Sequence, residues 1–291
     1  MAEIRTVGVI GSGTMGSGIA IVAARAGFPT IVYDSDAAAL ARARRQTAGF
    51  LEKSVERKRL SEAERERILG DIVGTERLEE LAAADIVIEA VFEDLAVKHE
   101  VFAKTDRICG PGTIFASNTS TLSITEIAAG TGRADRFIGM HFCLPAPLMK
   151  LVEMSPGLST DDAVFATAWA FCEAMGQRPV KTKDEPGFVL NALLVPYNND
   201  AIRLVEAGVA EPADIDRAMK RGMGYPMGPL ELIDLIGLDT QLLLCEALYG
   251  RTRDPRAACP PLVRRMIAAG FLGRKAGQGF YRYDRDAMFG G

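Results

Sequence analysis

The chain has 291 residues, of which 48% are hydrophobic and 25% are charged, and its formal net charge is -4. These values are ordinary for a chain that folds into one or two domains, and they exclude disordered and collagen-like proteins. No block of basic residues and no long apolar run is present, which argues against binding to nucleic acid and against insertion into a membrane. Five scattered cysteines without metal-ligand spacing, and an N-terminus without a signal peptide, predict a soluble cytoplasmic protein with reduced thiols and no metal site.

Short β-branched runs alternate with longer helical patterns through about the first 180 residues. Strands are expected over residues 6–10, 30–33, 72–73, 86–89, 113–116, 137–141, 151–154 and 180–182. Helices are expected between them, over residues 15–26, 36–57, 95–107 and 161–175. This alternation is typical of an α/β fold with a Rossmann-type, doubly wound and mainly parallel sheet. The charged stretch 36–67 predicts a solvated helical pair that stands out from the sheet.

The pattern changes after residue 184, where strand signals nearly vanish. Amphipathic helices are expected over residues 189–206, 212–221, 228–236, 238–249 and 261–269. The sequence therefore predicts a Rossmann-like domain over residues 1–184, followed by a smaller all-helical domain over residues 185–291. Apolar stretches in two of these helices exceed what one small layer buries, so we expect a homodimer through the helical domain.

A glycine motif joins the first strand to the first helix, and it reads Gly11-Ser12-Gly13-Thr14-Met15-Gly16. The first glycine permits the tight turn, the second lets the backbone approach a pyrophosphate, and the third lets helix and strand pack closely. The N–H groups at the start of the helix can then bind the phosphates. The alternative is a glycine-rich turn that binds no ligand.

Asp34 ends the second strand, where an acidic side chain can bond the hydroxyls of an adenosine ribose. A carboxylate there repels a 2′-phosphate, so NAD is favoured over NADP as the cofactor. The alternative for Asp34 alone is a helix N-cap. The two domains are thus expected to be an NAD-binding domain and a helical dimerisation and substrate domain.

The chain contains two histidines, His99 and His141. His99 lies in a polar helical pattern and is interpreted as an exposed surface residue. His141 ends an apolar strand at the edge of the sheet where doubly wound folds bind ligands. A single histidine at a strand end is often structural, and its neighbours decide the interpretation.

Several strings occur in a fixed order along the chain. They are Ser117-Asn118-Thr119-Ser120-Thr121-Leu122, Gly139-Met140-His141-Phe142, Met149-Lys150-Leu151-Val152-Glu153, Pro186-Gly187-Phe188-Val189-Leu190-Asn191, Tyr225-Pro226-Met227-Gly228-Pro229 and the segment 273–281. Together with the glycine motif, this series resembles the L-3-hydroxyacyl-CoA dehydrogenases, including the bacterial 3-hydroxybutyryl-CoA dehydrogenases. The resemblance covers essentially the whole chain. It implies an NAD-dependent oxidoreductase of fatty acid metabolism that interconverts (3S)-3-hydroxyacyl-CoA and 3-oxoacyl-CoA, and a dimer through the C-terminal domain.

The resemblance also implies roles for individual residues. His141 would be the general base or acid, and Glu153 would orient its imidazole. Ser120 and Asn191 would bind the oxygens of the substrate. Taken singly, each of these residues also has a structural interpretation. They are then a structural histidine, a salt-bridged or surface glutamate, a turn serine and an N-cap asparagine.

Further contacts with ligands follow from the same resemblance. Glu89, Lys98, Ser120 and Lys275 match positions near the cofactor, and Ser54 matches a serine that contacts the CoA. The chain departs from the family pattern at Leu144, where the family has asparagine, and after Asn191, where it has alanine instead of arginine. These departures leave open a dehydrogenase of a free 3-hydroxy acid or sugar acid, and a non-catalytic NAD-binding protein is a further alternative.

Overall fold

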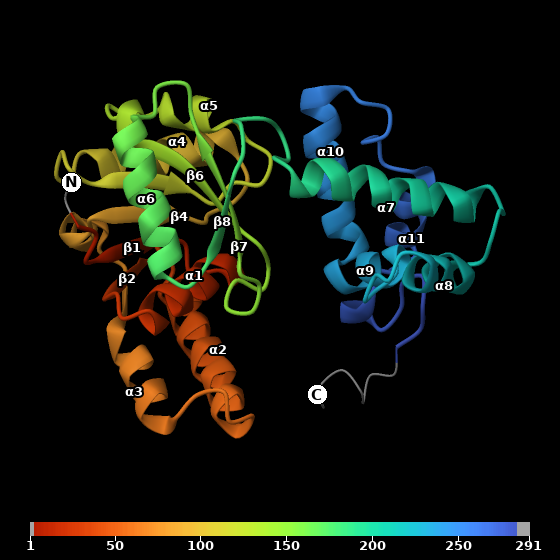
Figure 1. The fold of residues 1–291 in the computed structure, drawn as a ribbon, viewed down its shortest axis with the longest axis horizontal. Helices are drawn as coiled ribbons and strands as arrows, with labels where there is room; N and C mark the ends of the chain where they lie inside the picture. The colour runs from red at the N-terminus through yellow and green to blue at the C-terminus, as the bar shows by residue number, and fades with distance from the viewer. Residues whose placement is uncertain (1–2, 284–291) are drawn as a thin grey trace. The chain divides into compact units, whose positions relative to one another are not determined.

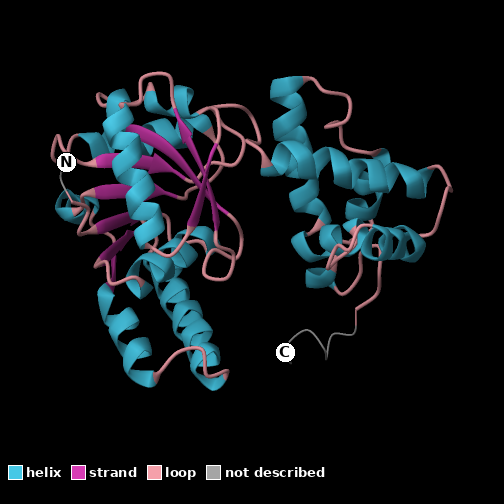
Figure 2. Cartoon of the chain, viewed as in Figure 1, coloured by secondary structure: helices cyan, strands magenta, loops and turns pink. Residues whose placement is uncertain are grey.

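The computed structural model describes residues 3–283 and divides the chain into two compact units. The first unit ends at Phe188 and the second begins at Val189, a short distance after the predicted domain end at residue 184. The first unit is a sheet covered by helices, and the second consists mainly of helices (Figure 2). The predicted fold class is therefore confirmed.

The strands of the described residues form one sheet in the order β3-β2-β1-β4-β5-β6-β7-β8. Their bounds are β1 Val7–Ile10, β2 Thr30–Tyr33, β3 Ile72–Thr75, β4 Ile86–Glu89, β5 Ile114–Ser117, β6 Phe137–Phe142, β7 Leu151–Pro156 and β8 Arg178–Lys181. Every neighbouring pair is parallel except β6 and β7, which are antiparallel. The carboxyl ends of β1, β4, β5 and β6 therefore meet at one edge of the sheet, the edge where such folds bind ligands.

The helices of this unit lie close to the predicted positions. They are α1 Thr14–Arg25, α2 Ala37–Glu56, α3 Glu62–Asp71, α4 Leu95–Asp106, α5 Ile124–Ala128 and α6 Asp162–Ala174. The predicted helical pair is confirmed, because α2 and α3 extend away from the sheet (Figure 1). Helix α5 and the 3-10 segments Leu78–Ala83 and Ala134–Arg136 were not predicted. These segments are too short to show helical periodicity.

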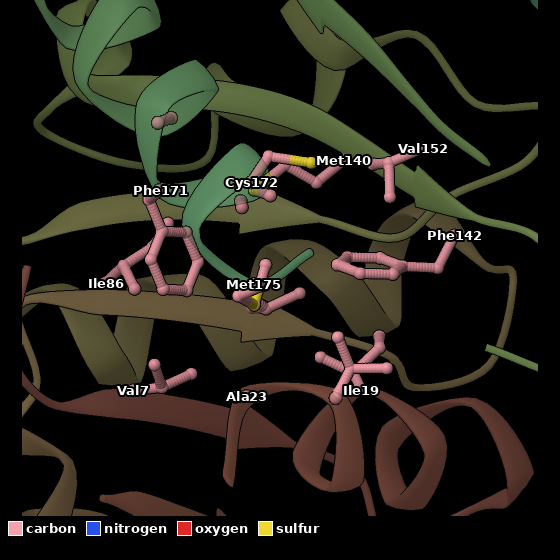
Figure 3. Close-up of a cluster of buried hydrophobic side chains, with 14 of the residues drawn as sticks. Val7, Ile19, Ala23, Ile86, Met140, Phe142, Val152, Phe171, Cys172 and Met175 are labelled. Carbon is pink, nitrogen blue, oxygen red and sulfur yellow. The ribbon is translucent and has the colours of Figure 1, made fainter. Parts of the chain in front are cut away.

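Alternate side chains of the strands pack against opposite faces of the sheet. One face carries Val7 and Met140, which pack with α1 and with Phe171 of α6 (Figure 3). The other face carries Phe115, which packs with Phe102 of α4 and with residues of α5. Because both faces are covered, the strands are apolar throughout, and they hold the residues at their carboxyl ends in fixed positions.

The second unit is built from five longer helices within the described residues. They are α7 Leu190–Glu206, α8 Pro212–Gly222, α9 Pro229–Ile236, α10 Leu238–Thr252 and α11 Pro261–Ala268, and a 3-10 turn covers Arg274–Ala276. Two buried carboxylates connect its segments. Asp216 accepts a hydrogen bond from the backbone N–H of Leu230 (2.8 Å), and Asp234 accepts one from each backbone N–H of Phe280 and Tyr281 (2.9 Å each). The segment at residues 280–281 is thereby bound to the helical core.

Long apolar helices are absent from the part of the chain that the structure describes. In residues 3–283, none of the helices has both the length and the hydropathy that a bilayer crossing needs.

Candidate functional site

The glycine motif forms the turn between β1 and α1, and its three glycines have different surroundings. Gly11 has a φ of +97°, and a Cβ there would lie 2.7 Å from the carbonyl oxygen of Ala90. A Cβ on Gly16 would collide with the carbonyl oxygen of Gly11. At Gly13, by contrast, a Cβ would meet no other described atom within 4 Å, so the backbone there faces open space.

Gly13 is the N-cap of α1, and among the described residues no side chain caps this helix. The backbone N–H groups of the first turn, including those of Thr14 and Met15, are thus available at the positive end of the helix dipole. An open backbone approach at a helix N-terminus is the arrangement that binds the pyrophosphate of a dinucleotide. The residues present therefore fit NAD at this turn.

Asp34 lies beside the glycine motif. One carboxylate oxygen accepts hydrogen bonds from the backbone N–H (2.8 Å) and the hydroxyl (2.7 Å) of Ser12, and the other accepts one from Asp36 N–H (3.1 Å). The interpretation of Asp34 as a helix N-cap is wrong, because Asp36 caps α2 by accepting from Ala38 N–H. Ser12 instead holds the Asp34 carboxylate next to the loop, as a contact with the ribose requires.

His141 and Glu153 are directly opposite each other in the antiparallel ladder of β6 and β7. The distance from His141 Nδ1 to Glu153 Oε2 is 2.8 Å, and both side chains are buried. A carboxylate accepts hydrogen bonds, so it favours the tautomer with the proton on Nδ1. This tautomer leaves a lone pair on Nε2, so the imidazole, held in position by the Glu153 carboxylate, has the arrangement that a general base requires.

Asn118 forms a hydrogen bond that connects β6, the strand of His141, to the end of the neighbouring strand β5. The residue follows β5, and its side-chain oxygen accepts a hydrogen bond from the backbone N–H of Phe142 (2.9 Å), the residue after His141. The contact continues the β5–β6 pairing beyond the last ladder pair, which joins Ser117 and Gly139. The backbone on either side of the imidazole is thus held by hydrogen bonds.

Glu93 organises the loop that contains Ser120, a role that the sequence pattern does not predict. Its Oε1 atom accepts hydrogen bonds from Thr119 Oγ1 (2.5 Å) and from the backbone N–H of Ser120 (2.8 Å) and Thr121 (2.9 Å). Burial alone would raise the pKa of Glu93, but the ammonium of Lys98 and these hydrogen bonds hold it below its usual value. An ionised carboxylate therefore fixes the loop. The only signal in the sequence was an acidic residue before a helix, which does not distinguish it from the N-cap Asp94.

Glu89 and Lys98 form a buried ion pair beneath this loop. Lys98 Nζ lies 2.6 Å from Glu89 Oε1 and 3.3 Å from Glu93 Oε2, and the Glu89 and Lys98 side chains are 0% and 1% exposed. Ser117 Oγ donates a further hydrogen bond to Glu89 (2.6 Å). The structure thus brings together two of the predicted cofactor contacts, and it places their side chains below the surface.

Three further predicted contacts have surroundings of their own. Ser54 is buried in α2, and its hydroxyl donates to the carbonyl of Phe50 (2.9 Å). Asn191 and Lys275 belong to the second unit. Asn191 is buried inside α7, so it is not the N-cap, and Lys275 Nζ lies 2.6 Å from both carboxylate oxygens of Asp239.

The other candidates for chemistry have structural explanations. His99 is half-buried, and its Nε2 atom lies 2.7 Å from the carbonyl oxygen of Glu126. Burial, with a contribution from Glu153, raises the pKa of Cys143 to about 11, so its thiol is neutral at physiological pH. Within residues 3–283 no group of three or more histidine, cysteine or carboxylate side chains could hold a metal ion.

The loop between β6 and β7 exposes large apolar side chains. Leu144, Leu148 and Met149 are 59%, 53% and 48% exposed, whereas Cys143 is buried. Leu144 therefore does not pack into the core.

Comparisons with known proteins agree along nearly the whole described length. A model of the 3-hydroxyacyl-CoA dehydrogenase NAD binding domain matches residues 6–185, and a model of the C-terminal domain of the same enzymes matches residues 187–283. The chain is 47% identical over 282 residues to a probable 3-hydroxybutyryl-CoA dehydrogenase of Bacillus subtilis, with 97% of this chain and 98% of the relative covered.

Solved structures give the same result. The crystal structure of FadB2 from M. tuberculosis is similar with a TM-score of 0.95 and 44% identity, covering 97% of this chain and 100% of that one. The (S)-3-hydroxybutyryl-CoA dehydrogenase PaaH1 of Ralstonia eutropha has a TM-score of 0.92 and 44% identity at the same coverage.

Proposed function

The chain belongs to the 3-hydroxyacyl-CoA dehydrogenase family, and on this premise we propose that it interconverts (3S)-3-hydroxyacyl-CoA and 3-oxoacyl-CoA with NAD, acting on short acyl chains such as 3-hydroxybutyryl. The observation that carries the proposal is the buried His141–Glu153 pair, with a distance of 2.8 Å between Nδ1 and Oε2, at the sheet edge where the glycine motif begins. A protein that only binds NAD has no need of an oriented base there.

His141 moves the proton in the proposed reaction. Nε2 accepts the proton of the 3-hydroxyl during oxidation and returns it to the 3-oxo oxygen during reduction. NAD, when bound, supplies the hydride acceptor in oxidation and the hydride donor in reduction. Glu153 stabilises the imidazolium that forms, because its carboxylate is buried against Nδ1. Ser120, on the loop held by Glu93, and Asn191 are the proposed hydrogen-bond donors to the substrate oxygens.

The proposed cofactor contacts divide into two groups. The backbone of the glycine motif (residues 11–16) would bind the pyrophosphate, and Asp34 would bind the adenosine ribose. Glu89 and Lys98 would act mainly by supporting the loop of Ser120, since their side chains are buried. Lys275 of the helical unit is a further proposed contact with NAD, and Ser54 on α2 is a proposed contact with CoA.

We further propose a cytoplasmic homodimer that functions in fatty acid metabolism. The helical unit exposes large apolar side chains, with Leu193 70%, Leu235 50% and Leu243 65% accessible. A second copy of this chain is the occupant that would cover them. Light scattering at micromolar concentration should give about twice the chain mass of 31.3 kDa, and a mass of one chain would contradict the proposal.

The enzyme proposal is tested by following absorbance at 340 nm with acetoacetyl-CoA and NADH. We expect rapid NADH oxidation by the native protein and about 10²–10⁴-fold slower oxidation by His141→Gln. Free acetoacetate should be a poor substrate in the same assay. Equal rates with the free acid would favour the alternative of a free hydroxy acid, and no oxidation of NADH with either substrate would contradict the proposal.

A further inference from the structure

The segment Asp184–Phe188 connects the sheet unit to the helical unit, and its beginning is fixed to α5. The carboxylate of Asp184 accepts hydrogen bonds from the hydroxyl of Ser123 (2.9 Å) and from the backbone N–H groups of Ile124 (2.6 Å) and Thr125 (2.8 Å). These groups form the N-terminus of α5, where a negative charge is favourable. The segment thus leaves the sheet unit at a defined point.

The end of this segment has an unusual backbone. Gly187 and Phe188 both have positive φ, +79° and +47°, and the N–H of Phe188 donates to the carbonyl of Glu185 (3.0 Å). The left-handed conformation is easy for glycine but unfavourable for phenylalanine, whose Cβ approaches the carbonyl oxygen. Such a conformation persists where the surroundings stabilise it, and it often marks a functional position.

The surroundings of Phe188 explain why the conformation is retained. Its side chain is 7% exposed and belongs to the apolar cluster with Ile124 and Phe137. Its ring centroid lies 5.8 Å from that of the His141 imidazole, with 37° between the ring planes. The turn at 187–188 therefore places an aromatic ring against the proposed base.

We infer that Phe188 is a positioning residue, which holds the imidazole of His141 in the orientation that proton transfer requires. The contact with Glu153 fixes Nδ1 at 2.8 Å but leaves the ring able to rotate about that hydrogen bond. The ring of Phe188 restricts this rotation, and Nε2 then points in one direction. This inference rests on the proposed function, because it assigns a task in the same proton transfer.

Substitutions at Phe188 separate positioning from simple packing. Phe188→Gly removes the ring but relaxes the positive φ, whereas Phe188→Ala removes the ring and keeps the strain. We expect both variants to lower kcat for acetoacetyl-CoA about 100-fold, since a misplaced catalytic group costs this much, with KM and the Kd of NADH changed by less than about threefold. Thermal unfolding should show the glycine variant to be the more stable of the two. Phe188→Tyr, which keeps the ring, should restore most of kcat.

A kinetic isotope effect and a matched control complete the test. With NADH deuterated at the transferred position, the isotope effect on kcat should increase in Phe188→Gly, because the chemical step becomes rate-limiting. A smaller fraction of folded enzyme would lower the rate without changing the isotope effect. Phe102→Leu is the control, because Phe102 is 0% exposed in the same cluster and contacts the rings of Phe115 and Phe137.

The outcomes distinguish this inference from the proposed function. The inference is overturned if Phe188→Gly keeps the native kcat, or if Phe102→Leu lowers kcat as strongly as Phe188→Ala. In either case the native protein would still oxidise NADH with acetoacetyl-CoA. A native protein without this activity would instead contradict the proposed function itself.

Discussion

The buried carboxylate opposite the imidazole gives the sharpest quantitative prediction. Glu153→Gln keeps the shape of the side chain but removes its charge, and Glu153 is 2% exposed. Two unit charges about 4 Å apart attract each other by about 4 kcal/mol at an effective dielectric constant of about 20. This attraction acts on the imidazolium that forms during oxidation, and about 1.4 kcal/mol corresponds to a factor of ten in rate.

The charge of Glu153 alone would therefore increase the rate by a factor of about 10³. The dipole of the glutamine amide retains part of this stabilisation of the imidazolium. We expect kcat of Glu153→Gln to be about 10²–10³-fold below that of the native enzyme, with little change in the Kd of NADH. The amide can also present its NH₂ group to Nδ1, which favours the tautomer with the proton on Nε2, and that tautomer is not a base.

Steady-state oxidation of 3-hydroxybutyryl-CoA measures kcat, and quenching of protein fluorescence measures the Kd of NADH. Glu246→Gln is the control, since Glu246 forms an exposed ion pair with Arg264 (2.7 Å) that should contribute little. A loss of less than about threefold in kcat for Glu153→Gln would refute the electrostatic reasoning.

Four further predictions concern single residues. His141→Gln should reduce kcat by about 10²–10⁴-fold, whereas His99→Gln, which loses a contact with a carbonyl, should change the melting temperature and leave kcat near the native value; the opposite ranking in the kcat assay would contradict the assignment of the base. Asp34→Ser should raise kcat/KM for NADPH relative to NADH at least about tenfold, because the repulsion of a 2′-phosphate is removed; an unchanged ratio would exclude contact with the ribose. Cys143, whose pKa is raised to about 11, should resist alkylation by iodoacetamide at pH 7.5 and react faster as the pH approaches 11, measured by peptide mass spectrometry. Rapid alkylation at neutral pH would mean that its thiol is not buried. Leu144→Asn should alter selectivity among acyl-CoA chain lengths by roughly 2–13-fold, the effect of one hydrogen bond. It should not lower the melting temperature, because the Leu144 side chain is 59% exposed, and a stability loss at unchanged selectivity would be evidence against a role of Leu144 in substrate selectivity.

The sequence predicts the sheet well because its strands are covered on both faces. A strand such as Val7–Ile10 is a continuous apolar run, which is the pattern of a buried parallel strand, and the predicted run at 30–33 has the observed bounds. Helix α5 has five residues, fewer than two helical turns, so no periodicity could identify it. The predictable elements are therefore those whose side-chain pattern repeats.

The candidate site is less predictable, since it depends on contacts between distant residues. Lys98 lies in a polar stretch that indicates solvent exposure, yet it is 1% exposed because Glu89 of β4 neutralises its charge. Glu93 has the appearance of a loop acid, and its importance follows from the loop at 119–121, which is about 26 residues further along the chain. Sequence patterns describe neighbours along the chain, and they do not describe such partners.

The antiparallel pairing of β6 and β7 has a consequence for how this enzyme can change over evolution. The ladder from Ile138 to Phe142 fixes the position of His141 opposite Glu153, whereas residues 143–150 lie outside this ladder. A connection of another length or composition costs little in closure entropy, since that cost grows slowly with loop length. A slip of one residue in the ladder, however, would turn Glu153 to the opposite face of the sheet. Insertions and recombination within this connection, which begins two residues after His141, can thus change the loop while the acid–base pair is inherited unchanged, which makes the loop a natural place for new substrate preferences to arise.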